Sequence, residues 1–235
     1  MFSNYLKTAL RSFKRNKTFS LINIVGLSGG LACFVLITVY VHNELNYDTY
    51  PASAKNIYRV NLNVTGNGDV AVYPLVDLAV GEGMKSAFPE VKEFARLAPS
   101  HGFFKYEDKQ FKEDKLAFAD SSFLQLFSIP LIEGNNVTAL VQPNSMVVSK
   151  TFASKYFGDN SPLGKSLVFG SNGQLFKITG VFDKIPDNSH FHFDAFLSLS
   201  SWQIKNPTWS NIRVFTYLLL NKDTDIKKLQ NKFRK

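Results

Sequence analysis

The stretch LINIVGLSGGLACFVLITVYV, residues 21–41, is 21 residues long and contains no charged side chain. A helix that crosses a hydrocarbon core of about 30 Å needs about 20 apolar residues. A cleaved signal peptide has a shorter apolar core, of roughly 7 to 15 residues, followed by small residues at a cleavage site. The run here ends in Val39, Tyr40, Val41 and His42, which offer no such site. The stretch therefore predicts a transmembrane helix from Leu21 to Val41, with an uncleaved or late-cleaved signal sequence as the alternative.

The segment before this run is basic. Five cations and no acidic residue stand among the first 20 residues: Lys7, Arg11, Lys14, Arg15 and Lys17. Because cations beside a span favour the cytoplasmic side, we expect a cytoplasmic amino terminus and an exterior chain after His42. Leu6, Leu10 and Phe13 recur at helical spacing among these cations, which predicts an amphipathic helix in the cytoplasmic headgroup layer. A basic flank that only sets the topology is the alternative.

The composition of the remaining chain is that of a folded domain. Of the 27 basic residues five lie before the apolar run, and the rest are nearly balanced by the 19 acidic residues. This balance indicates no broad nucleic-acid-binding surface. The single cysteine, Cys33, lies inside the apolar run, so the exterior part has no disulfide and depends on burial for its stability.

Strand and helix patterns alternate in the exterior part. A β-rich run from Asn56 to Val64 ends at the turn cluster Thr65-Gly66-Asn67-Gly68. A helix is expected from about Leu75 to Phe88, and EFARLAP, residues 93–99, is expected to form the next strand. This order predicts that the domain starts with a β-α-β unit.

Two hairpins and two short helices are expected further along the chain. Turns are predicted at Glu107-Asp108-Lys109 and at Asn172-Gly173, each between alternating apolar and polar positions. Ser149 is expected to cap a helix that stops at Gly158, and another helix is expected to start near Asp225. The mixture predicts the α+β class.

The stretch HFHFD, residues 190–194, is a weak candidate for a metal site. On a strand His190, His192 and Asp194 would share one face, and such residues are zinc ligands. A structural histidine pair near a loop is the preferred interpretation.

Other chemistry finds less support in the sequence. The stretch GDNSPLGKS, residues 158–166, has the wrong glycine spacing for a phosphate-binding loop, and Pro162 removes an amide from the cradle. No G-x-S-x-G nucleophile motif is present. We therefore predict no catalytic residue and no cofactor, and expect no Ser or Asp hydrogen-bonded to His190 or His192 in an open pocket.

Several segments resemble, in the same order, the amino-terminal unit of MacB/FtsX-type ABC transporter permeases. They are LKTALRSFKRNKTFSLINIVGLSGGLACFVLI, NELNYDTYPASAKNIYRV, FADSSFLQLFSIPLIEGN, SMVVSKTFASKYFGDNSPLGKSL and FKITGVFDKIPDNSHFHFDAFLS. Each is only moderately specific alone, but all of them in register after a basic-flanked span are a strong pattern.

The resemblance implies an α+β fold with one N-terminal transmembrane helix and a MacB-like periplasmic core, in which a porter-like β-α-β lobe carries an inserted second lobe. It implies a non-catalytic permease subunit of the bacterial inner membrane, which relays ATPase-driven motion to the periplasmic domain for export or mechanotransmission. The implied partners are a separate or fused cytoplasmic ABC ATPase, a second permease copy, a periplasmic adaptor or outer-membrane protein, and membrane lipid. No nucleic acid is implied.

The resemblance also gives expected domain boundaries. They are a cytoplasmic amphipathic basic segment at 1–18, a transmembrane helix at 19–42, the periplasmic core at 43–222, and the start of a helix towards the next membrane segment at 223–235. The candidate coupling residues are Leu6, Leu10 and Phe13 before the helix, and Glu44, Tyr47 and Asp48 after it.

The sequence departs from the family in one respect. Such permeases have several spans, whereas only one run here is long enough to cross a bilayer. The chain is therefore expected to be a fragment or a truncated product of a longer permease. A single-span sensor or scaffold with an exterior binding lobe, and a membrane-anchored exterior hydrolase, are the alternatives.

Overall fold

The computed structural model describes residues 4, 5, 8, 11, 14–51, 53–66, 69–202, 204 and 213–233. The chain divides into two compact units, a helical unit, Met1–Tyr47, and a sheet unit, Asp48–Lys235.

The helical unit contains one long helix, α2 (Lys17–Leu45), which includes the predicted span. Its 29 residues give a length of about 44 Å. It is long and apolar enough to cross a membrane, with a mean hydropathy of 2.2 in its most apolar window. None of its residues is buried, which is typical of a helix whose apolar side chains face lipid rather than a protein core.

Among the described residues the sheet unit is built around a sheet of ten strands, and a separate two-stranded ribbon, β2–β3, lies outside it. The strands are β1 (Ile57–Val60), β2 (Leu62–Gly66), β3 (Asp69–Tyr73), β4 (Val76–Asp77), β5 (Val91–Tyr106), β6 (Lys109–Ala119), β7 (Leu131–Gly134), β8 (Ser145–Ser149), β9 (Ser166–Phe169), β10 (Gln174–Phe182), β11 (Ala195–Ser198) and β12 (Arg213–Leu220). The helices are η1 (Ala54–Asn56), α3 (Val80–Ala87), α4 (Phe123–Leu126), α5 (Lys150–Phe157), η2 (Leu199–Trp202) and α6 (Ile226–Lys232).

The main path of the sheet runs β1-β12-β5-β6-β11-β8-β10-β7. The β11–β6 and β10–β8 ladders are parallel, and the other ladders are antiparallel. Because β1 and β5 both pair antiparallel with β12, they run in the same direction, with α3 between them in the sequence. The order agrees with the predicted β-α-β start, but the predicted strand from Asn56 to Val64 is divided, because β1 ends at Val60 and β2 pairs with β3 outside the main sheet.

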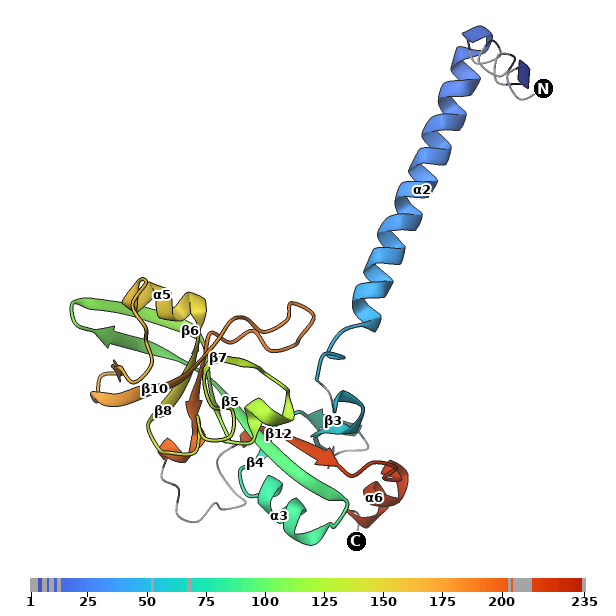
Figure 1. The fold of residues 1–235 in the computed structure, drawn as a ribbon. Coiled ribbons are helices and arrows are strands. Elements are labelled where there is room, and N and C mark those ends of the chain that lie inside the picture. The colour runs from blue at the N-terminus through green and yellow to red at the C-terminus, as the bar shows by residue number, and fades with distance from the viewer. Residues whose placement is uncertain are drawn as a thin grey trace. The chain divides into compact units, whose positions relative to one another are not determined.

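β5 is a long strand of 16 residues, and it pairs with different strands along its length (Figure 1). The first half of β5 pairs with β12, and its far end pairs with β9. Both sheet faces are apolar. In β8, for example, Met146 and Val148 belong to one buried cluster, and the intervening Val147 belongs to another.

Local turn and cap chemistry places several elements where the sequence predicts them. The β5–β6 turn has Glu107 at a φ of 52°, and the β9–β10 turn has Gly173 at a φ of 72°. The Ser149 hydroxyl accepts the Phe152 N–H at the start of α5, and Gly158 ends it. The Asp225 carboxylate caps α6 in the same way, by accepting the Lys228 N–H.

The predicted helix from Leu75 to Phe88 is too long. Val76 and Asp77 form β4 and pair with β12, so the chain is extended there and α3 begins only at Val80. Gly81 lets α3 approach the sheet closely, because an added Cβ would lie 2.5 Å from a ring carbon of Phe94.

Residues 190–194 lie in a loop, as the preferred interpretation of histidines near a loop expects, and the strand face that the weak metal candidate would need is absent. These residues have no regular secondary structure, and β11 starts at Ala195. The reason is that side chains take two of the backbone N–H groups that a strand would use. The His190 N–H donates to the Asp48 carboxylate, and the Phe191 N–H donates to the Ser189 hydroxyl.

Candidate functional site

The predicted coupling residues fall into three groups. Leu6, Leu10 and Phe13 lie outside the described residues. Glu44 and Tyr47 belong to the helical unit, and their coupling role stays a prediction. Asp48 is the first residue of the sheet unit, and it is bonded to the loop that precedes β11.

Asp48 makes three hydrogen bonds to that loop. Its backbone N–H donates to the Asn188 carbonyl at 2.7 Å. Its Oδ1 accepts the backbone N–H of His190 at 2.9 Å, and its Oδ2 lies 2.8 Å from His190 Nδ1. Asp48 has a φ of 56°, a conformation that Asp adopts more readily than most residues. One carboxylate therefore fixes both the backbone and the ring of His190.

His190 connects Asp48 to β12. A carboxylate only accepts hydrogen bonds, so the network assigns the proton on this side to Nδ1. In the neutral ring Nε2 is then an acceptor for the Tyr217 hydroxyl, which lies 3.1 Å away. The Tyr217 ring packs edge-to-face on Phe127, with centroids 5.0 Å apart. We name Asp48, His190 and Tyr217 the clamp.

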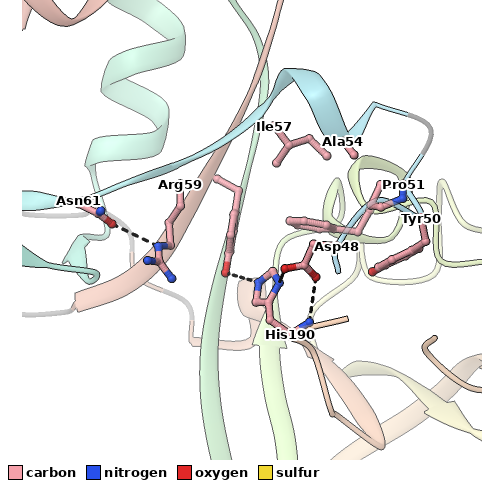
Figure 2. A pocket seen from close by; sticks show the side chains of 10 residues that line it. Asp48, Tyr50, Pro51, Ala54, Ile57, Arg59, Asn61 and His190 are labelled. Atoms are coloured by element: carbon pink, nitrogen blue, oxygen red, sulfur yellow. Dashed lines mark hydrogen bonds and ion pairs between the residues drawn. The ribbon is translucent and has the colours of Figure 1, made fainter. Parts of the chain in front are cut away.

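The clamp lines a pocket of about 410 Å³, which we name the clamp pocket (Figure 2). The other lining residues are Tyr50, Pro51, Ala54, Ile57, Arg59, Asn61 and Phe127. Arg59 is the cation of this set, and its Nε donates to Asn61 Oδ1 at 3.2 Å. The volume lies within the range of small-ligand pockets, about 300 to 1,000 Å³.

Burial raises the pKa values of the two phenols that line the clamp pocket, Tyr217 and Tyr50. Burial raises the pKa of Tyr217 to about 12, although the Arg59 guanidinium opposes the rise and the Asp48 carboxylate adds to it. Burial also raises the pKa of Tyr50, against a hydrogen bond with the Ser189 side chain. Both hydroxyls therefore remain protonated at neutral pH.

The expectation that no Asp would be hydrogen-bonded to His190 in an open pocket is wrong, because Asp48 makes this bond. The residues are 142 positions apart, and only the fold brings them together. An Asp–His pair can activate a nucleophile. Here, however, the third group is a buried phenol with a raised pKa, which disfavours the phenolate. No Ser, Thr or Cys stands among the described residues that line the pocket. The geometry suits holding a segment better than nucleophilic attack.

The three residues of the weak metal candidate are not arranged as the sequence suggests. His190 lines the clamp pocket, whereas His192 and Asp194 line a separate cavity of about 140 Å³. In the part of the chain that the structure describes, no group of three His, Cys, Asp or Glu residues is placed to hold a metal ion.

The opposite face of β12 holds α6. Leu229 of α6 is buried in a cluster with Val91, Leu218 and Leu220. Phe233 packs edge-to-face on Phe88, and Lys232 forms an ion pair with Glu90. The hydrogen bond from Lys232 lowers the pKa of the Glu90 carboxyl. One strand therefore contacts both the segment that follows α2 in the sequence and the helix at the far end of the described chain.

Sequence reasoning missed Tyr217 and Arg59. These residues are directly opposite one another in the β1–β12 ladder. Tyr217 stands in an apolar strand pattern, RVFTYLLLN, whose only unusual feature is a hydroxyl that must find a partner when buried. Nothing local identifies that partner.

Comparison with known proteins decides the family. Residues 20–235 match the MacB-like periplasmic core domain. This chain belongs to that family. The α+β fold and the resemblance to MacB-type permeases are thereby confirmed, and the chain is a MacB-like periplasmic domain of the ABC-type permease family with a candidate transmembrane helix at its start. No curated protein sequence matches it.

Solved structures share the MacB-like fold. A domain described as part of a permease protein from Porphyromonas gingivalis aligns with a TM-score of 0.66 and 24% identity, over 77% of this chain and 79% of that one. The periplasmic region of MacB from Actinobacillus actinomycetemcomitans aligns with a TM-score of 0.54 and 15% identity, over 75% and 80%. The extracellular domain of the noncanonic ABC-type transporter YknZ from Gram-positive bacteria gives 0.54 and 16%, over 76% and 95%.

Proposed function

We propose that this chain is the N-terminal part of the permease subunit of an ABC transporter complex. In this proposal α2 crosses the bacterial inner membrane, residues 1–18 lie on the cytoplasmic side, and the MacB-like core lies in the periplasm. Family membership and the apolar helix support anchoring in a membrane. The basic flank before α2 supports the orientation.

The proposed task of the core is to receive motion from the membrane helices. The clamp is the observation that carries this proposal. Asp48 follows the last residue of α2 by three positions and is bonded to His190, which in turn contacts Tyr217 in the sheet. A force that reaches Asp48 along the chain would act on β12 rather than extend a loose linker.

The proposed complex contains a cytoplasmic ABC ATPase and a second permease copy, and both associations are general in this family. ATP-driven closure of the dimer would move the helices, and the core would pass that motion to a cargo, a periplasmic adaptor or an outer-membrane protein. Efflux and mechanotransmission are both compatible with this scheme.

The orientation is tested by cysteine labelling in intact cells. Cys33 is the only cysteine, so Cys33→Ala gives a background in which a single cysteine can be placed at Lys150, an exposed residue of α5. A membrane-impermeant maleimide should label Lys150→Cys from outside, and should label Lys17→Cys only after the cells are opened. Labelling of Lys17→Cys alone in intact cells would reverse the proposed topology.

The relay is tested in the complete complex, purified with its ATPase into nanodiscs. Spin labels at Lys150→Cys of both permease copies should report a change of distance on ATP binding. Asp48→Ala should weaken that change while leaving ATP binding intact. Lys184→Gln is the matched control, since it removes a charge from the same loop without touching the clamp. An unchanged response in Asp48→Ala would refute the relay through the clamp.

A further inference from the structure

Within the described residues the outer edge of β1 is open. β1 ends the main path of the sheet, and its ladder is the one with β12. In an edge strand the backbone N–H and C=O groups of alternate residues point away from the sheet without a ladder partner. Such an edge can accept another extended chain.

The side chains of β1 line two cavities. Ile57 and Arg59 line the clamp pocket. Tyr58 and Val60 line a second cavity of about 560 Å³, which we name the α6 groove, and Arg59 lines this cavity as well. A strand added beside β1 would direct successive side chains alternately towards these two cavities.

The two cavities differ in chemistry. In the clamp pocket the Asp48 carboxylate is already bonded to His190, whereas the Arg59 guanidinium is hydrogen-bonded to the neutral Asn61 amide. Tyr217 is the ladder partner of Arg59, and its neutral hydroxyl is hydrogen-bonded to the Arg59 side chain. A cation beside a hydroxyl favours an acidic side chain. The α6 groove is lined by the buried Leu218, Leu220 and Leu229, and at its margin by Arg59 and by the amides of Asn61, Asn63 and Gln230; no acidic residue stands among its described lining residues. The leucines favour an aliphatic side chain.

We propose that β1 is a docking edge for an extended segment of a different protein. The segment adds to the sheet as a strand, places an acidic side chain in the clamp pocket and places a neighbouring aliphatic side chain in the α6 groove. Main-chain hydrogen bonds hold it, and the two cavities select it. This docking edge is independent of the relay proposed above.

Charge complementarity favours a different protein over a second copy of this chain. If β1 paired with β1 of a second copy around Tyr58, both Arg59 residues would lie on the same face, diagonal to one another. That arrangement brings two like charges together and places no acidic side chain in the clamp pocket of either copy.

The test uses the full chain in nanodiscs and a fluorescent probe peptide, acetyl-Leu-Glu-Leu-Glu-Leu-amide. Fluorescence anisotropy measures binding, and amide hydrogen exchange of residues 57–60 locates it. We expect saturable binding and slower exchange in β1. The peptide acetyl-Leu-Lys-Leu-Lys-Leu-amide should not bind. Of two Glu peptides that are N-methylated on alternate sets of residues, one should lose binding, because only one set faces β1.

Two variants with the same loss of charge complete the test. Arg59→Gln should weaken binding of the Glu peptide by about tenfold or more, since it removes the cation of the clamp pocket. Lys55→Gln should leave it unchanged, because Lys55 is an exposed cation just before β1 that lines neither cavity. Near-UV circular dichroism checks that both variants are folded.

Several results would overturn the docking edge. They are equal binding of the Glu and Lys peptides, equal binding of both N-methylated peptides, an unchanged affinity in Arg59→Gln, or no binding of any probe at about 1 mM. Protection of β1 that rises with protein concentration in the absence of peptide would assign the edge to a second copy instead. None of these results depends on the ATPase, so the relay is judged separately.

Discussion

The two faces of β12 are attached to their neighbours by different kinds of contact. On one face the clamp consists of polar groups, and the side chains of Asp48 and His190 are 39% and 35% exposed. On the other face α6 is held through Leu229, which is only 3% exposed, and through the ring contact of Phe88 with Phe233. Water therefore reaches the clamp directly, whereas the α6 attachment has a shielded centre at Leu229 and an exposed margin at Phe233, which is 42% exposed.

The difference assigns different roles to the two attachments. Apolar burial stabilises without strong directional preference. Hydrogen bonds to a carboxylate stabilise less when water competes, but they require a defined geometry. We infer that the α6 contact supplies most of the stability at this strand, and that the clamp fixes the position of the segment after α2. Each variant below tests one side of this contrast.

The largest effect is expected for Leu229→Ala. The substitution leaves a cavity between α6 and β12 and should destabilise the sheet unit by about 3 kcal/mol. Urea unfolding of the full chain in detergent, followed by near-UV circular dichroism, measures the loss. Amide hydrogen exchange should accelerate in α6 and stay slow at residues 188–191. Equal acceleration at both places would mean that the two faces are not independent.

The next largest loss of stability is expected at alkaline pH, where the Tyr217 hydroxyl ionises. Its pKa is about 12 in the folded chain and near 10.0 when exposed, so the folded state binds the proton more tightly. The stability that comes from this difference is complete below pH 10 and is lost as the pH rises from 10 to 12. The loss is about 2 to 3 kcal/mol.

The variant Tyr217→Phe isolates this contribution. It cannot ionise, so its urea midpoint should fall less steeply between pH 10 and 12 than that of the wild type. Tyr156→Phe removes a buried phenol outside the clamp and should lessen the slope in the same way, since burial also raises the pKa of Tyr156. If Tyr217→Phe and the wild type lose stability in parallel, the Tyr217 hydroxyl is not buried as described.

Much of the fold follows from local sequence signals. The apolar run marks α2, the turn residues mark the β5–β6 and β9–β10 hairpins, and Ser149 and Asp225 mark the starts of α5 and α6. Each signal lies within a few residues of the element that it sets, which is why a single sequence contains it.

The candidate site depends on contacts that are distant in the sequence. HFHFD has the alternation of a strand, yet the Asp48 carboxylate takes the His190 N–H and the Ser189 hydroxyl takes the Phe191 N–H. A long-range side chain thus prevents a locally plausible strand. The opposition of Arg59 and Tyr217 likewise follows from ladder register, which no local pattern specifies.

A smaller effect is expected for Asp48→Asn. Asn also tolerates the positive φ and can still accept the His190 N–H, so the substitution removes mainly the charge that faces His190 Nδ1. We expect a loss of about 1 kcal/mol, because water partly screens this half-exposed contact. A double-mutant cycle with His190→Ala in urea unfolding should give a coupling of about the same size. Additive effects would show that the two side chains do not act as a pair.

The smallest change in stability, close to none, is expected for Lys184→Gln. This variant compares an exposed ion pair with the Asp48–His190 bond of the same loop. Lys184 and Asp187 form an ion pair at 2.9 Å, a distance as short as those of the clamp, but their side chains are 68% and 89% exposed. The hydrogen bond to Asp187 raises the pKa of Lys184, yet water and salt screen a pair that is so exposed. The urea midpoint and the hydrogen exchange of residues 188–191 should both stay at their wild-type values. If Lys184→Gln instead accelerated exchange there as much as Asp48→Asn does, loop charge in general would hold His190 in place, and the specific bond from Asp48 would not be needed.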